Sequence, residues 1–415
     1  MIALGARFTE LPESLVSKRR HYGDYYAEQA HKQLDLRVIS ITTVQECILL
    51  GTLCFVEGKP ESEALYYAAA NRLAQILDLP HRPASNELER QVNLRVWWSL
   101  YMIDIWTSSG LRIPRELDLQ GATDLPIDEE HFLRLAYASP RSEYGAPGIW
   151  AEMAKLARIW AEIQVLNKAS VDGRLSPNSL NRSVDELAAN LDRWQAELPE
   201  FLVETPENLT RWNGNLRTAF AALHLGFHFY NEVLFYQFLA KGDNGGRTAD
   251  VSNYAQRCTW HALAFCDLLY ACEDTEDCDC LYVMVGHMLT VTSTVYVHTL
   301  LFSFDEGEVG EARTRLERNF AILTKLQRYW IMLDRTLSRL QAFHNACKES
   351  IEQSFQMDSW MLRFIMEHGT SLPEKFTKPT ALGFGHHSGA TSDGTSSTGS
   401  PVGVNLQEWY SQTFG

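Results

Sequence analysis

Two histidines, His224 and His228, lie four residues apart in a segment with helical periodicity. On a helix this spacing places both imidazoles on one face, where they could hold one metal ion. The intervening residues are Leu-Gly-Phe, so the glutamate that acts as general base in a zinc protease motif is absent. His261 and His287 are further histidines, but the sequence identifies neither as a third ligand. We interpret the pair as two histidines of a helical core.

The most acidic stretch is Glu273–Asp279, with the sequence Glu-Asp-Thr-Glu-Asp-Cys-Asp. Several carboxylates so close together could bind a hard cation, and the stretch is similar to the aspartate-rich motif with which terpene synthases hold magnesium and diphosphate. The second metal-binding motif of that family does not occur downstream, and no Arg or Lys for a diphosphate lies nearby. An all-α enzyme or small-molecule binding protein with a metal site at 273–279 is therefore the alternative hypothesis. We favour a solvated loop between helices.

The other chemical signatures are missing. Eight cysteines are scattered along the chain without a CxxC pair, so we expect neither a structural zinc site nor a redox motif, and a reduced intracellular compartment. The glycines at 242–246 match neither nucleotide-binding fingerprint, and no G-x-S-x-G elbow occurs. We expect no catalytic residue, no bound cofactor and no metal in this chain, which is thus not an enzyme.

Composition and charge set further limits. The chain has 415 residues, of which 45% are hydrophobic and 11% aromatic, values typical of a large globular protein. Its net charge of −15 argues against direct nucleic-acid contact, which needs clustered Lys and Arg. The one compact basic run, Lys18-Arg19-Arg20, is interpreted as a solvated helix face rather than a nuclear localisation signal.

One segment is long enough to span a membrane. Residues Leu281–Phe304 contain no charged residue. They do contain two histidines and several Thr and Ser, and no Lys or Arg anchors either end. We therefore predict a central buried helix of a helical bundle and no membrane contact.

Helical periodicity dominates the chain, and no strand alternation extends beyond a few residues. We predict an all-α fold, a large bundle-like domain over residues 1–368 followed by a disordered Gly/Ser/Thr-rich tail with an aromatic end over 369–415. A Ser183-x-x-Glu186 capping box predicts a helix start there. One long helix is expected over 309–352, and a loop-rich connection over 109–148.

The least generic element is a helix predicted from Asn86 to Ser108, with Ser85 as a suitable N-cap residue. Its second half is almost wholly apolar, which is typical of a helix buried in a large core. Asp104 interrupts it, and an unpaired buried carboxylate is costly, so a partner is required. The candidate partners are Arg95, Arg112 and Arg115.

This helix resembles the middle regulatory domain of fungal transcription factors of the binuclear zinc-cluster class. The family's pattern there is an acidic-basic turn, a Trp-Trp pair, a Tyr, an Asp, a Gly-Arg-Pro loop and a later Leu-Pro. The matching positions in this sequence are Glu89, Arg95, Trp97, Trp98, Tyr101, Asp104, Gly110, Leu125 and Pro126. Residues 66–82 are similar to the preceding helix of the family. Ile105 replaces the usual basic residue, and Gly-Leu-Arg-Ile-Pro stands in place of Gly-Arg-Pro.

The resemblance is strongest over residues 1–130, and it implies structural roles for six motif residues: Arg95, Trp97, Trp98, Tyr101, Asp104 and Gly110. It also implies a nuclear transcription regulator whose separate N-terminal cysteine cluster binds zinc and DNA. That cluster is missing here, so we expect a fragment, a truncated gene product or a protein that has lost its DNA-binding part. Zinc is expected only in the missing cluster.

The partners that the resemblance implies are the transcription machinery or co-regulators, together with a small-molecule effector. A homodimer, or a heterodimer with a full-length factor, is equally compatible with the residues, and so is a co-regulator that never binds DNA itself. The sequence does not identify the effector, the target genes, the sign of regulation or the oligomeric state.

Overall fold

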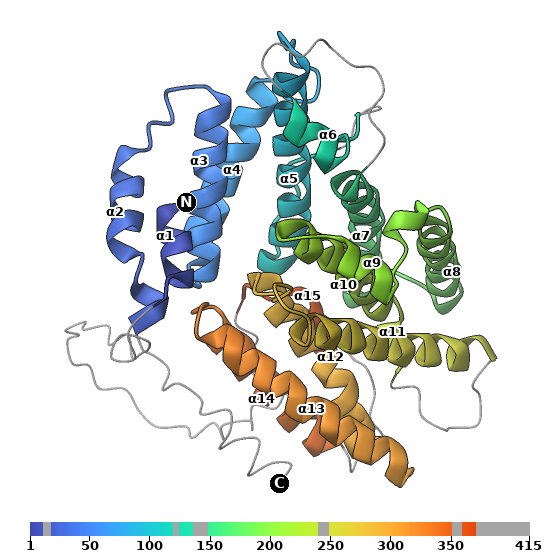
Figure 1. Ribbon diagram of the computed structural model, residues 1–415. Coiled ribbons are helices and arrows are strands. Elements are labelled where there is room, and N and C mark those ends of the chain that lie inside the picture. The colour runs from blue at the N-terminus through green and yellow to red at the C-terminus, as the bar shows by residue number, and fades with distance from the viewer. Residues whose placement is uncertain (11–17, 119–123, 136–147, 240–248, 351–358, 371–415) are drawn as a thin grey trace, which may run out of the picture.

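The computed structural model describes residues 1–10, 18–118, 124–135, 148–239, 249–350 and 359–370. Over these ranges the chain forms fifteen α-helices and no strand, which confirms the predicted all-α fold (Figure 1). The tail predicted to be disordered lies outside the described residues from residue 371 onward.

The helices follow one another in chain order with mostly short connections. They are α1 (Ile2–Gly5), α2 (Asp24–Gln33), α3 (Ile41–Val56), α4 (Pro60–Ile76), α5 (Glu87–Leu111), α6 (Glu129–Arg134), α7 (Ile149–Val171), α8 (Pro177–Ala196), α9 (Pro206–Arg211), α10 (Asn215–Phe235), α11 (Ala249–Glu273), α12 (Val283–Phe302), α13 (Glu306–Gln327), α14 (Leu333–Ser350) and α15 (Ser359–Met366).

Helix α5 lies in the middle of the molecule, between the blue N-terminal helices and the green group formed by α7 to α10 (Figure 1). It packs against α4 on one side and α7 on the other. Helix α3 pairs with α4, α10 pairs with α11, and α12 packs against both α13 and α14. The helix that carries the motif residues therefore joins the N-terminal helices to the rest of the fold.

An aromatic cluster fills the junction of α5, α7 and α10. Trp106 of α5 lies 5.0 Å from Trp160 of α7 and 5.9 Å from Phe229 of α10, measured between ring centroids. Trp160 stacks on Tyr230 at 4.3 Å. Each such pair contributes about 0.5–1.5 kcal/mol beyond its area burial, so this cluster fixes how the three helices meet.

Helix starts follow capping chemistry, with one correction. The Asn86 side chain accepts a hydrogen bond from the Glu89 amide at 2.9 Å, so Asn86 is the N-cap of α5 instead of Ser85. The predicted start at Ser183 is wrong, because α8 begins at Pro177 with Ser176 as its N-cap. Proline at the first helical position is pre-organised for a helix start, and the Ser-x-x-Glu pattern falls inside the helix.

Two other predictions concern the C-terminal half. The prediction of a single helix over 309–352 is wrong, because the chain turns at Arg328–Met332 and forms two helices, α13 and α14. Within this turn Trp330 is buried, and its Nε1 donates to the Leu281 carbonyl at 2.7 Å. The apolar segment 281–304 forms α12, whose residues from Val285 to Val297 are buried in the protein. No helix in the described ranges combines the length and apolarity needed to cross a bilayer.

Candidate regulatory cleft

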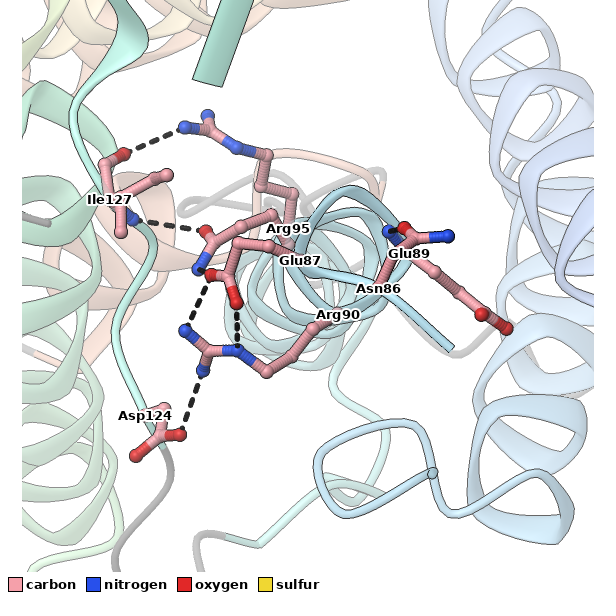
Figure 2. A network of polar contacts seen from close by, with 8 residues as sticks. Asn86, Glu87, Glu89, Arg90, Arg95, Asp124 and Ile127 are labelled. Carbon is pink, nitrogen blue, oxygen red and sulfur yellow. Dashed lines mark hydrogen bonds and ion pairs between the residues drawn. The ribbon is translucent and has the colours of Figure 1, made fainter. Parts of the chain in front are cut away.

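The first two turns of α5 carry an ion-pair network. Glu87 is fully buried, and Arg90 binds it through two donors, with Nη2 to Oε1 at 2.7 Å and Nε to Oε2 at 3.0 Å. Arg90 also pairs with Asp124 at 3.0 Å (Figure 2). A buried carboxylate needs such a partner, so this network ties the segment that begins at Asp124 to α5.

Arg95 extends the same connection. Its Nη2 donates to the Ile127 carbonyl at 2.7 Å (Figure 2). Its Nη1 pairs with Glu129 at 3.2 Å, and the guanidinium lies over the Phe132 ring at 4.0 Å. Burial lowers the pKa of Arg95 and raises that of Glu129, and their mutual charge opposes both effects. Arg95 is therefore a partner of the 124–134 segment and not of Asp104.

The two motif tryptophans and the tyrosine lie in the interior. Trp98 is 2% exposed and its Nε1 donates to the Asp124 carbonyl at 2.9 Å. The Tyr101 ring meets Trp98 edge-on at 5.4 Å. Trp97 is also buried, and its Nε1 has no hydrogen-bond partner among the described residues.

Asp104 anchors the loop that follows α5. Its side chain, 5% exposed, pairs with Arg115 at 3.2 Å and accepts from the backbone amides of Glu116 at 3.0 Å and Leu117 at 3.2 Å. Asn71 of α4 adds a contact at 3.4 Å. Of the three candidate arginines, Arg115 is thus the partner, and its guanidinium also lies 4.9 Å from the Tyr101 ring.

Gly110 receives a segment from the far end of the chain. A Cβ at this position would lie 2.4 Å from Cε1 of the buried His368, and the Gly369 amide donates to the Gly110 carbonyl at 3.1 Å. We call residues Met366–Thr370 the C-terminal strap. Only a residue without a side chain allows the strap this close to the last turn of α5.

The strap has three further anchors. Arg335 of α14 donates to the carbonyls of Gly369 at 2.8 Å and of Gly58, after α3, at 3.0 Å. Arg339 donates to the Thr370 carbonyl at 2.7 Å. Arg112 pairs with Glu367 at 3.0 Å. Arg112 ends α5 with φ 57°, a left-handed conformation that costs a non-glycine residue about 1–2 kcal/mol.

A cleft of about 230 Å³ lies where the end of α5, helix α7 and the strap meet. Apolar side chains and the Ser109–Gln164 hydrogen bond of 2.6 Å form its walls. Its charged lining residues are Arg112, Arg115, Lys168, Asp172 and Glu367. A concave apolar surface with a few placed charges is the usual form of a small-molecule site, so this is the candidate regulatory cleft.

The motif residues thus have different structural roles. Arg95 and Trp98 contact the 124–134 segment, whereas Tyr101 and Asp104 hold Arg115, and Gly110 lies against the strap. Sequence reasoning did not identify Lys168 or Glu367 as neighbours of this helix end, because no local pattern links α7 or the strap to α5.

The histidine pair lies in a buried cluster with a third histidine and a glutamate. His228 Nδ1 lies 3.0 Å from His261 Nδ1, and its Nε2 lies 2.8 Å from Glu204. His224 Nε2 lies 2.9 Å from the Leu202 carbonyl. Burial lowers the pKa of His224 to about 4 and that of His261 to about 2, so both rings are neutral at pH 7. Ring-to-ring and ring-to-carboxylate hydrogen bonds satisfy the cluster.

The acidic stretch 273–279 is engaged by cations from α13. Lys325 binds Glu273 at 2.9 Å and Asp279 at 2.7 Å, and Arg318 binds Asp274 at 2.8 Å. Three of the five carboxylates of this stretch are therefore paired with cations, and the alternative metal-site hypothesis gains no support from this geometry. No group of three or more metal-ligating side chains suited to a metal ion is found in the described part of the chain. All eight cysteines are buried free thiols.

Comparison with known proteins points to one family. Residues 1–196 match the model of the fungal specific transcription factor domain. The chain is also 23% identical over 252 residues to Activator of stress genes 1 of Saccharomyces cerevisiae, an alignment that covers 57% of this chain and 26% of that protein. The chain thus spans about a quarter of the length of that relative. No solved structure matches.

Proposed function

We propose that this chain is the regulatory part of a transcription regulator, on the premise that residues 1–196 form a fungal specific transcription factor domain. The observation that carries the proposal is this match, which contains the whole of α5 and all six motif residues. A regulator rather than an enzyme is also consistent with the ion-paired state of the acidic stretch.

Residues 1–368 act, in this proposal, as one helical regulatory domain. Support comes from a single hydrophobic cluster that includes Ala3 at one end of the chain and Ile365 at the other. The strap adds polar links between the same regions, because Arg335 holds Gly58 and Gly369 together. We propose that a change at one helix junction is passed to the others through these packed contacts.

The cleft supports an effector-responsive role. It lies beside the loop that the motif residue Asp104 anchors, and it is formed by three separate parts of the chain. A ligand there would contact all three parts at once. Co-regulators, a second copy or a full-length DNA-binding factor are the proposed macromolecular partners, and the nucleus is the proposed location.

A tethering experiment tests this function. The chain is fused to a heterologous bacterial DNA-binding domain and directed to a reporter gene in yeast. We expect reporter transcription to rise or fall several-fold relative to the DNA-binding domain alone. The untethered chain should leave the reporter unchanged, since its net charge of −15 disfavours DNA contact. Equal transcription from the tethered chain and from the DNA-binding domain alone would contradict the proposal.

A further inference from the structure

The cleft combines an apolar wall with positive charge. Ile105, Ala161, Val165, Val171 and Met366 supply the wall. Arg115 is committed to Asp104 at 3.2 Å, and Asp172 is paired with Arg174 at 2.7 Å, so these two charges are balanced outside the cleft. The charges left to face a ligand are those of Arg112, Lys168 and Glu367.

These three charges do not cancel. Arg112 is 51% exposed at its side chain and has an ion pair to Glu367 at 3.0 Å. Lys168 is exposed on α7 and has no ion pair with any residue that the structure describes. One positive charge therefore remains beside an apolar wall, which is the arrangement that attracts an anion with an apolar body.

We propose that the cleft binds a small aliphatic carboxylate, whose chain lies on the apolar wall and whose carboxylate pairs with Lys168 and competes with Glu367 for Arg112. This inference rests on the proposed function, because it names the effector chemistry of that same regulatory cleft. The two cations would contribute in different ways. The guanidinium of Arg112 can donate two hydrogen bonds to one carboxylate, whereas the ammonium of Lys168 is a point charge on a flexible side chain.

Competition for Arg112 couples ligand binding to the strap. The Glu367 side chain is 9% exposed, and its other cationic neighbours are Arg363, 3.8 Å away, and Arg339. Loss of Arg112 would leave a buried carboxylate poorly paired, which is unfavourable. Glu367 is directly followed by His368 and Gly369, which lie against Gly110. A bound carboxylate should therefore loosen the strap from the end of α5.

The ligand test uses a matched pair of probes. Hexanoate and hexanamide have the same chain, but only hexanoate carries a charge. We expect isothermal titration calorimetry of the purified full chain to detect hexanoate and to show at least about tenfold weaker binding of hexanamide, as loss of a charge-assisted contact predicts. Hydrogen exchange at the strap amides should speed up with hexanoate present. Equal binding of the two probes, or no hexanoate binding up to about 10 mM, would overturn the proposal.

Variants test the competition. Lys168→Gln should weaken hexanoate about tenfold, whereas Lys32→Gln on the distant α2 should not. Glu367→Gln should strengthen binding several-fold, because it removes the competing carboxylate, and a purely structural role of Glu367 predicts the opposite. Circular dichroism confirms that each variant is folded. Unchanged affinity in Lys168→Gln, or weaker affinity in Glu367→Gln, would refute the competition.

The two proposals fail separately. A chain that alters the tethered reporter but binds no hexanoate refutes the ligand inference alone. If the chain binds hexanoate through Lys168 but leaves the reporter unchanged, the proposed regulatory function is refuted, whereas carboxylate binding in the cleft is supported.

Discussion

Asp104 is buried at the end of a nearly apolar helix, and four donors surround its carboxylate. Arg115, two backbone amides and Asn71 together hold the loop after α5 in place. The sequence predicted that a partner was needed and narrowed it to three arginines, of which one is used. It could not predict the two amide donors, because their position depends on the path of the loop.

Replacing Asp104 by Asn should destabilise the protein by about 1–3 kcal/mol. The amide would keep the shape of the carboxylate but remove its charge and turn one acceptor into a donor that faces other donors. Urea denaturation followed by circular dichroism measures the change. Asp118→Asn, at an exposed position in the segment that follows α5, is the control. Equal stability of the two variants would contradict this account of the anchor.

A second buried carboxylate, Glu232 of α10, has a single hydrogen-bond partner through one oxygen. Its Oε2 accepts from Thr292 at 2.7 Å, while Oε1 has no partner among the described residues. Burial raises the pKa of Glu232 from 4.5 to about 8. Between pH 4.5 and about 8, Glu232 is therefore protonated in the folded protein but ionised in the unfolded chain. Because the folded state binds the extra proton, the free energy of unfolding falls as the pH rises through this range.

Glu232→Gln should remove this pH dependence, since the amide does not ionise. The free energy of unfolding of the variant minus that of the unmodified protein should be larger at about pH 8.5 than at about pH 5. The increase should be at most about 1.4 kcal/mol for each unit by which the pKa of Glu232 is raised. Thermal unfolding at both pH values gives the measurement. Glu186→Gln, at an exposed site on α8, should show no such difference. A stability difference that is the same at both pH values would disprove the protonated state.

At the scale of elements, the junction between α5 and the strap is the least predictable feature. Gly110 was identified as a motif residue, yet its role depends on His368 and Gly369, which lie near the opposite end of the chain. Helix periodicity carries no information about such a contact. The same limit explains why Ser183 was wrongly predicted to begin a helix: a local capping pattern competes with Ser176-Pro177 just upstream.

Gly110→Ala tests the junction. The new Cβ would approach the buried His368 ring to 2.4 Å, so either the strap or the helix end must shift. Overpacking of this kind costs about 1–3 kcal/mol, and the Gly369 amide should exchange with deuterium faster. Hydrogen exchange with mass spectrometry of the 366–370 region measures this. Gly310→Ala, in α13 with no atom near the added carbon, should be neutral or slightly stabilising. Unaltered exchange in Gly110→Ala would contradict the packing role.

At the scale of the molecule, composition and periodicity were sufficient to predict an all-α fold and a buried α5, because both follow from apolar patterning summed over long segments. They were also sufficient to reject a membrane span at 281–304. The candidate cleft was not predictable. Its walls come from α5, α7 and the strap, and only the folded chain brings Lys168 and Glu367 to Arg112.

The burial of all eight cysteines has a practical consequence for experiments on this protein. Burial raises the pKa of several of these thiols, including Cys47 and Cys54 to about 11, so they are poor nucleophiles toward maleimides. Thiols introduced on the surface should then react while the native cysteines do not. Fluorophores attached in this way to α2 and to α8 would report interhelix distances in real time without first replacing a native cysteine.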